Sequence, residues 1–155
     1  MQLTQYKIGM YKRLQEVDRD YAAAGERPYF ALKNALDYAA WLLLLKDNRR
    51  GIGLPPGWSP YELNALADDS GRLLCLGQLR FGDDCGNTTW AGHIGYSVPP
   101  SLRGNGYAKA YLSLCLARAW DLGAERVMLT CDVDNLASKA VIEHCGGDFA
   151  GVYRD

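Results

Sequence analysis

The residues best suited to chemistry lie in one short segment, residues 98–108, which read V-P-P-S-L-R-G-N-G-Y-A. The prolines would end a strand, and a helix would begin near Tyr107. The first turn of a helix leaves backbone N–H groups unpaired and carries a partial positive charge. Gly104 and Gly106 would let a ligand approach that backbone, and Arg103 adds a cation. The segment therefore predicts a phosphate-binding loop, although a tight strand-to-helix turn without a ligand would have the same pattern.

Two nucleotide-binding motifs fit this segment less well. The ATP phosphate loop ends in Gly-Lys-Ser/Thr, whereas Gly106 is followed by Tyr and Ala. The dinucleotide fingerprint needs a third glycine where Lys109 stands, and its strand should run into the first glycine, whereas Pro99 stops the strand early. Dinucleotide binding is therefore the weaker alternative.

The elements that must position this segment change in type along the chain. Helices are predicted over residues 6–24 and from about residue 29 to 49, and an irregular loop over 51–60. Strands are then predicted over 62–67, 72–81 and 89–98, a helix over 107–122, a buried strand over 126–133, a helix over 136–144 and a last strand from 148 to 154. Helices, then an antiparallel meander, then a β-α-β-α-β half predict a mixed α/β fold with one central sheet. The apolar run 41–45 would belong to its core.

Composition limits the classes of protein that fit. The chain has 155 residues, is 48% hydrophobic and carries a formal net charge of −1, which fits one domain and argues against a nucleic-acid binder. Residues 1–7 do not resemble a signal peptide, and the apolar stretch 38–45 is far shorter than the ~20 residues that cross a membrane. The five cysteines form no CxxC pair, so we expect no metal site, reduced thiols and a cytoplasmic location.

Residues 98–108 resemble the acetyl-CoA loop of the GNAT superfamily of N-acetyltransferases, through Val98, Pro100, Arg103, Gly106 and Ala108. A second match follows one helix and one strand later. In the family an Asn ends that strand and a short helix then runs to a Gly, and this sequence has Asn135 and Gly146 at those places. The resemblance covers roughly residues 61–153, and residues 1–60 match only as helices and a loop. It implies a single GNAT-like domain over 1–155, with a helical acceptor side over 1–60 and an acetyl-CoA-binding core over 61–155.

In this family acetyl-CoA, the co-substrate, lies between the fourth and fifth strands. The resemblance implies that it contacts Ser97, Val98, Arg103, Gly104, Asn105, Gly106, Tyr107, Ala108 and Asn135. Asn135 would equally suit a helix N-cap, and the two roles can coexist. Family members usually end in two further strands, of which this chain would lack one or both. The exposed sheet edge that results could bind a second copy in a homodimer.

The resemblance implies that a primary amine of a small molecule or peptide attacks the thioester directly in a ternary complex. A backbone N–H near Val98 would stabilise the oxyanion. Relatives often assist thiolate departure with a Tyr at the position of Ile142, so Ser138, three residues after Asn135, is the candidate here. The alternative is that Ser138 caps or packs its helix.

The general base is less defined, because Gly92 stands where many relatives have a Glu on the fourth strand. His93 is a candidate, since an imidazole titrates near neutral pH, but the strand period places it on the opposite face unless a bulge intervenes. Tyr96 and Asp132 are the other candidates, and no base is needed if the amine deprotonates through water. His93 would otherwise be a structural, hydrogen-bonded residue.

The acceptor would be selected on the helical side. Arg80 and Trp58 are candidate substrate-binding residues, although ordinary packing would explain Trp58 equally well. The unusual residues at positions 92 and 142 also motivate a different class of function, a non-catalytic acyl-CoA-binding or interaction module with this fold.

Overall fold

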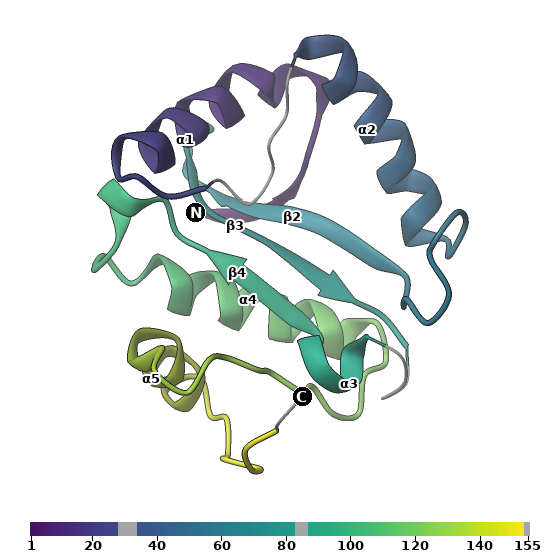
Figure 1. Ribbon diagram of the computed structural model, residues 1–155, viewed down its shortest axis with the longest axis vertical. Helices are drawn as coiled ribbons and strands as arrows, with labels where there is room; N and C mark the ends of the chain where they lie inside the picture. The colour runs from purple at the N-terminus through teal and green to yellow at the C-terminus, as the bar shows by residue number, and fades with distance from the viewer. Residues whose placement is uncertain (28–33, 83–86, 154–155) are drawn as a thin grey trace.

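The computed structural model describes residues 1–27, 34–82 and 87–153 (Figure 1). Its centre is a four-stranded antiparallel sheet in the order β1-β2-β3-β4, formed by Gln2–Gln5, Tyr61–Ala67, Leu73–Arg80 and Ile94–Ser97. The α-helices of the described residues are α1 (Tyr11–Ala23), α2 (Ala35–Arg49), α3 (Thr88–Ala91), α4 (Tyr107–Asp121) and α5 (Leu136–His144), with 3-10 turns η1 (Ile8–Met10) and η2 (Pro100–Leu102). The predicted mixed α/β fold class is confirmed.

Helices cover both faces of the sheet, with α1 and α2 on one side and α4 on the other (Figure 1). Toward α1 and α2 the sheet presents Leu63, Ala65 and Leu76, and toward α4 it presents Leu66, Cys75, Leu79 and Ile94. Neighbouring residues of one strand point to opposite faces. In β4, Tyr96 therefore faces α4, whose Tyr111 ring lies 6.2 Å from its own, and Ser97 faces α1.

The first elements differ from the prediction. Gln2–Gln5 form an edge strand that pairs with β2, from Gln2 opposite Ala67 to Gln5 opposite Asn64. The period of three and four correctly indicated a helix, but that helix begins at Tyr11. The second helix was expected from residue 29, yet residues 29–33 lie outside the described residues, and α2 begins at Ala35 with Asn34 as its N-cap.

The predicted third strand is shorter than expected. Residues 88–91 form the single helical turn α3, and only Ile94–Ser97 join the sheet. Gly92 ends α3 with φ of 70°, a backbone conformation that favours glycine. The Arg80 guanidinium then donates to the carbonyl oxygens of Ala91, at 3.2 Å, and Gly92, at 2.7 Å. These contacts hold the end of α3 against Arg80, the last residue of β3.

The prediction of a buried strand over 126–133 is wrong. These residues adopt no regular structure, and residues 130–133 are exposed. One backbone hydrogen bond, from His93 N–H to the Met128 carbonyl at 2.7 Å, joins this segment to the chain before β4. Val127 and Leu129 still pack against the core, so the apolar pattern is satisfied without a full ladder. Residues 148–153, expected to begin a last strand, are also irregular, and residue 154 lies outside the described residues.

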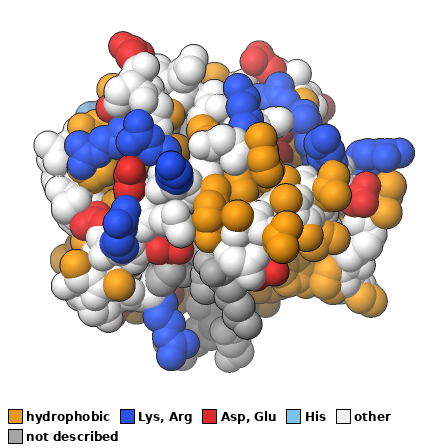
Figure 2. Space-filling model, turned by 90° about the horizontal axis from the view of Figure 1, so that it is seen from above, with side chains coloured by type: hydrophobic (Ala, Val, Ile, Leu, Met, Phe, Trp, Pro, Cys, Tyr) orange, Lys and Arg blue, Asp and Glu red, His pale blue; other side chains and the backbone are white. Residues whose placement is uncertain are grey.

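The expectation that all of residues 41–45 belong to the core is wrong in part. Trp41, Leu42 and Leu45 pack against it, whereas Leu43 and Leu44 are 65% and 58% exposed. Seen from above, hydrophobic side chains accordingly reach the surface on the side where α2 lies (Figure 2). Among the described residues no helix is long and apolar enough to cross a membrane. Cys75, Cys115, Cys131 and Cys145 are free thiols, and Cys85 lies outside the described residues.

Candidate functional site

The chain between β4 and α4 turns from a strand into a helix, as the sequence predicted. Gly104 and Gly106 have φ angles of 80° and 79°, in the left-handed region. No atom lies within 4 Å of a Cβ built on either glycine, so glycine is required here by conformation rather than by crowding. The backbone of the loop is therefore open to a ligand.

The N-terminus of α4 is suited to an anion. Gly106 is its N-cap and, having no side chain, leaves the first-turn amides uncapped within the part of the chain that the structure describes; the first turn holds no acidic residue. Such unpaired N–H groups and the helix dipole attract phosphate. Asn105 braces the loop by donating from Nδ2 to the carbonyl oxygens of Leu102, at 3.0 Å, and Arg103, at 3.2 Å. Uncapped amides beside open space fit the pyrophosphate of acetyl-CoA.

Arg103 is held by protein groups rather than standing free at the loop. Its two terminal nitrogens donate to the Glu26 carboxylate at 2.7 and 2.6 Å, and its Nε donates to the Val98 carbonyl at 3.2 Å. The hydrogen bond from Arg103 is the main cause that lowers the pKa of Glu26, and the same bond raises the pKa of Arg103. Arg103 therefore ties the loop to the chain just beyond α1.

Two further contacts join α1 to this region. The hydroxyl groups of Tyr21 and Ser97 are hydrogen-bonded, and Asp20 Oδ2 accepts from Ser101 N–H at 3.1 Å and Ser101 Oγ at 2.9 Å. Burial raises the pKa of Tyr21, so its hydroxyl stays protonated at neutral pH. Tyr21 and Glu26 were not among the site residues predicted from the sequence. Tyr21 fits the apolar face of a helix, and nothing in the sequence around Glu26 marks it.

Two of the candidate catalytic residues lie together. Tyr96 of β4 and Ser138 of α5 have their hydroxyl oxygens 2.8 Å apart. Burial is the main cause that raises the pKa of Tyr96, while the bond to Ser138 acts in the opposite direction. Asn135 is the N-cap of α5, because its Oδ1 accepts from Ser138 N–H at 3.0 Å. The cap uses the Asn135 oxygen and fixes the turn that carries Ser138.

His93 lies elsewhere, between the end of β3 and residue 128. It is 5% exposed, its Nδ1 accepts from Met128 N–H at 3.0 Å, and its carbonyl accepts from Arg80 N–H at 2.7 Å. A neutral imidazole that accepts at Nδ1 carries its proton on Nε2. This environment favours the structural interpretation of His93.

Gly92, the position where many relatives carry a Glu, has no room for a side chain. A Cβ there would lie 2.9 Å from the Met128 carbonyl oxygen and 3.2 Å from Thr130 N. A carboxylate at this position would require the backbone of residues 128–130 to move. The structure thus gives a physical reason for the glycine.

The two candidate substrate-binding residues lie near the start of β4. The Arg80 guanidinium caps the end of α3, as described above, and Trp58 is 48% exposed on the loop 51–60. Asn87 fastens this loop, because its Oδ1 accepts from Ser59 N–H at 3.0 Å and its N–H donates to the Gly57 carbonyl at 2.9 Å. Arg80 thus has a local structural role, whereas Trp58 presents an aromatic surface to solvent.

The chain is similar to acetyltransferases both in its sequence and in its fold. A sequence model described as an acetyltransferase (GNAT) domain matches residues 2–148, and no curated protein matches the chain. A candidate acetyltransferase from Agrobacterium tumefaciens is 16% identical, with full coverage of both chains and a TM-score of 0.59. A candidate ribosomal-protein-serine acetyltransferase from Vibrio cholerae is 15% identical over 93% of this chain and 77% of its own, with a TM-score of 0.64. The aminoglycoside N-acetyltransferase AAC(6')-Iy, solved in complex with CoA, is 16% identical over 99% and 98% of the two chains, with a TM-score of 0.56.

Proposed function

The chain belongs to the GNAT acetyltransferase family, and on this premise we propose that it transfers an acetyl group from acetyl-CoA to a primary amine of a small molecule or peptide. The observation that carries the proposal is the 2.8 Å contact between the Tyr96 and Ser138 hydroxyls. Tyr96 lies on β4, an edge strand of the sheet. The next residue is Ser97, and the loop with Gly104 and Gly106 follows it in the sequence. The similar structure of an aminoglycoside N-acetyltransferase with CoA supports the choice of donor and of an amine acceptor.

Acetyl-CoA would bind along the outer edge of β4, the last strand of the sheet in the described residues. The backbone of Ser97 and Val98 would pair with the pantetheine arm, as an added strand pairs with a sheet edge. The first-turn amides of α4, from Gly106 onward, would bind the pyrophosphate. Asn135 would donate from its amide nitrogen to the pantetheine while its oxygen caps α5. We assign residues 61–155 to this binding core and residues 1–60 to the acceptor side of a single domain.

Ser138 and Tyr96 would act on the leaving group. When the amine attacks the thioester, negative charge passes to the sulfur, and a hydroxyl that donates to it stabilises that charge. Ser138 would donate to the sulfur, and Tyr96 would donate to Ser138. Because burial raises the pKa of Tyr96, its hydroxyl remains a donor at neutral pH. This pair would replace the tyrosine that relatives carry at the position of Ile142.

We assign no side chain as general base. The Nδ1 of His93 is engaged by Met128, and Gly92 has no space for a carboxylate. The neutral fraction of the amine would therefore attack, with its proton lost to water. The contribution of the protein to this step is proximity and orientation of the two substrates.

The deciding experiment is calorimetric titration of the protein with acetyl-CoA, followed by measurement of free CoA thiol over a panel of small amines and peptides. We expect one binding site and thiol release with some of the amines. Absence of binding at high micromolar acetyl-CoA would refute the proposal. Binding without thiol release over a broad panel would instead favour the non-catalytic acyl-CoA-binding module, and titration with NAD tests the dinucleotide alternative.

A further inference from the structure

The strand pairing of β4 ends just before the peptide that joins Ser97 and Val98. Ser97 lies opposite Leu76 and is the last residue of β4 that pairs with β3. The chain then leaves the sheet at Pro99 and enters η2. Within the described residues no strand pairing holds the chain beyond Ser97, so other contacts fix the position of this peptide.

The N–H group of Val98 points to the outer edge of β4. Arg80 N–H donates to the carbonyl oxygen of its opposite residue, His93, at 2.7 Å. Hydrogen-bonded and non-hydrogen-bonded pairs alternate along an antiparallel ladder, so Ser97, four residues after His93, directs its backbone groups to β3. The next N–H therefore points the opposite way, and no described residue accepts a hydrogen bond from it. This N–H is the backbone donor expected above for the oxyanion.

Tyr21 holds the Ser97 side chain on the α1 face of the sheet. The hydroxyl groups of the two residues are hydrogen-bonded, and Tyr21 is 2% exposed. Leu14, Val17 and Tyr21 are the buried residues of α1 and belong to one core cluster. Because side chains in a core are closely packed, the ring of Tyr21 holds its hydroxyl at a fixed place beside Ser97.

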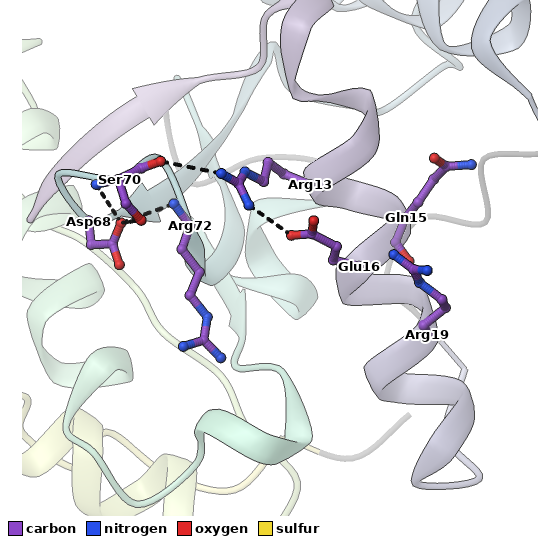
Figure 3. Close-up of polar contacts among 7 residues, drawn as sticks. All are labelled: Arg13, Gln15, Glu16, Arg19, Asp68, Ser70 and Arg72. Atoms are coloured by element: carbon purple, nitrogen blue, oxygen red, sulfur yellow. Dashed lines mark hydrogen bonds and ion pairs between the residues drawn. The ribbon is translucent and has the colours of Figure 1, made fainter.

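The start of α1 is tied to the sheet independently of Tyr21. Arg13 donates to Glu16 Oε2 at 3.2 Å and, weakly, to the Ser70 carbonyl at 3.5 Å, in the turn before β3 (Figure 3). The helix is therefore attached near its start through Arg13 and near its end through Tyr21. Loss of the Tyr21 hydroxyl would release Ser97 and leave the helix in place.

Arg103 holds the same part of the chain on the other side of the peptide. Its Nε donates to the Val98 carbonyl at 3.2 Å, and its terminal nitrogens bind the Glu26 carboxylate. The Ser97 side chain and the Val98 carbonyl flank the peptide that carries the Val98 N–H. Contacts on both sides therefore restrict the rotation of this peptide.

From these contacts we propose that Tyr21 is a positioning residue for acetyl transfer, which acts through Ser97 to orient the Val98 N–H toward the thioester carbonyl oxygen. The chemical part of this inference rests on the proposed function. A donor to an oxyanion is effective when it is already oriented, because no reorganisation is then needed at the moment of reaction. Tyr21 contacts neither substrate, since it is buried.

Steady-state kinetics, calorimetry and NMR relaxation of Tyr21→Phe test the proposal. The variant should lower kcat by roughly three- to tenfold and leave acetyl-CoA affinity unchanged, because the donor acts mainly in the transition state. Ser97→Ala should have the same effect, and the double variant should be no worse, since the two hydroxyls form one contact. The order parameter of the Val98 amide should fall from about 0.85, typical of a rigid backbone, toward about 0.6.

Tyr38→Phe is the matched control. Tyr38 is a buried tyrosine of the same core cluster, and its hydroxyl donates to the Lys7 carbonyl at 2.7 Å. Lys7 follows β1, at the opposite edge of the sheet from β4. This control also loses a buried hydroxyl and its hydrogen bond, but it should keep the wild-type kcat and the wild-type order parameter of Val98.

Three results would overturn the proposal. An unchanged Val98 order parameter in Tyr21→Phe would show that Tyr21 does not fix this peptide. A lowered order parameter with unchanged kcat would show that the orientation does not serve acetyl transfer. Equal losses of kcat in Tyr21→Phe and Tyr38→Phe would indicate general destabilisation. If the wild type releases no thiol at all, the proposed function fails, and the order parameter still decides whether Tyr21 orients the peptide.

Discussion

The Glu26 carboxylate accepts both terminal nitrogens of Arg103, at 2.7 and 2.6 Å. This pair joins the chain beyond α1 to the loop that leads into α4. Asp20 with Ser101 and Tyr21 with Ser97 join the same two regions. The end of β4 and the loop that follows it, where we propose that acetyl-CoA binds, are thus fastened to α1 and the chain just beyond it.

The first prediction follows from this pair. Glu26→Gln should weaken acetyl-CoA binding by roughly two- to fivefold, the range expected for an exposed ion pair, with little change in kcat. The hydrogen bond lowers the pKa of Glu26, so the contact is complete at neutral pH and is lost as the pH falls through that lowered pKa. The difference between the two proteins should therefore shrink in acid. Glu16→Gln, which removes a similar Arg–Glu pair away from the loop, is the control for this calorimetric comparison. Equal affinities in all three proteins would exclude a positioning role for Glu26.

The second prediction concerns the hydroxyl pair. Ser138→Ala and Tyr96→Phe should each lower kcat by roughly ten- to a hundredfold and leave acetyl-CoA binding unchanged, because only the departing thiolate loses a donor. The double variant should be little worse than Ser138→Ala, since the two hydroxyls act in series. Steady-state kinetics measure this, and Ser113→Ala on the exposed face of α4 is the control. An unchanged kcat in Ser138→Ala would remove Ser138 from the mechanism.

The third prediction concerns the loop. Gly106→Trp should abolish acetyl-CoA binding, because the side chain would fill the open space in front of the backbone and is strained at a φ of 79°. Gly9→Trp is the matched control, since Gly9 also has open space but no positive φ. Calorimetry should detect binding only in the control. Normal binding by both variants would move the pyrophosphate away from Gly106.

The strand-to-helix turn that holds Gly104 and Gly106 could be predicted from the sequence because its signal is local. Gly104 and Gly106 both have positive φ angles. Two such glycines just before a helix leave the backbone and the first-turn amides open to a ligand in any fold. Tyr96 and Ser138 were each identified as candidates, but their contact joins residues 42 apart and depends on how α5 packs beside β4. Glu26 could not be found because its partner lies 77 residues away.

The predicted limits of the strands over 89–98 and 126–133 were wrong for a related reason, since they depend on contacts with distant parts of the chain. Gly92 and residues 88–91 read as part of a strand, and their helical turn depends on Arg80 and Met128, which other parts of the chain bring there. Residues 126–133 have the composition of a buried strand, but strand formation needs a paired neighbour and not only an apolar sequence. Gln2–Gln5, in contrast, are too short and too polar to be identified before their partner β2 is known.

The last prediction links the core to the site. Gly77 lies opposite Tyr96 in the sheet, and a Cβ at Gly77 would overlap the Tyr111 hydroxyl and the Gly95 carbonyl oxygen. Tyr111 cannot withdraw freely, because it is fully buried and donates to Asn64 Oδ1 at 2.5 Å. Gly77→Ala should therefore lower the free energy of unfolding by about 1–3 kcal/mol, the usual effect of overpacking.

The same change should also lower kcat, because β4 must shift and carry Tyr96 away from Ser138. Urea unfolding measures the first effect and steady-state kinetics the second. Gly9→Ala, where no atom lies within 4 Å of the added Cβ, should leave both unchanged. A Gly77→Ala protein as stable as the wild type would show that a methyl group fits between Gly77, Tyr111 and Gly95 without overlap, against the contacts found here. A destabilised variant with unchanged kcat would instead separate the packing at Gly77 from the position of Tyr96.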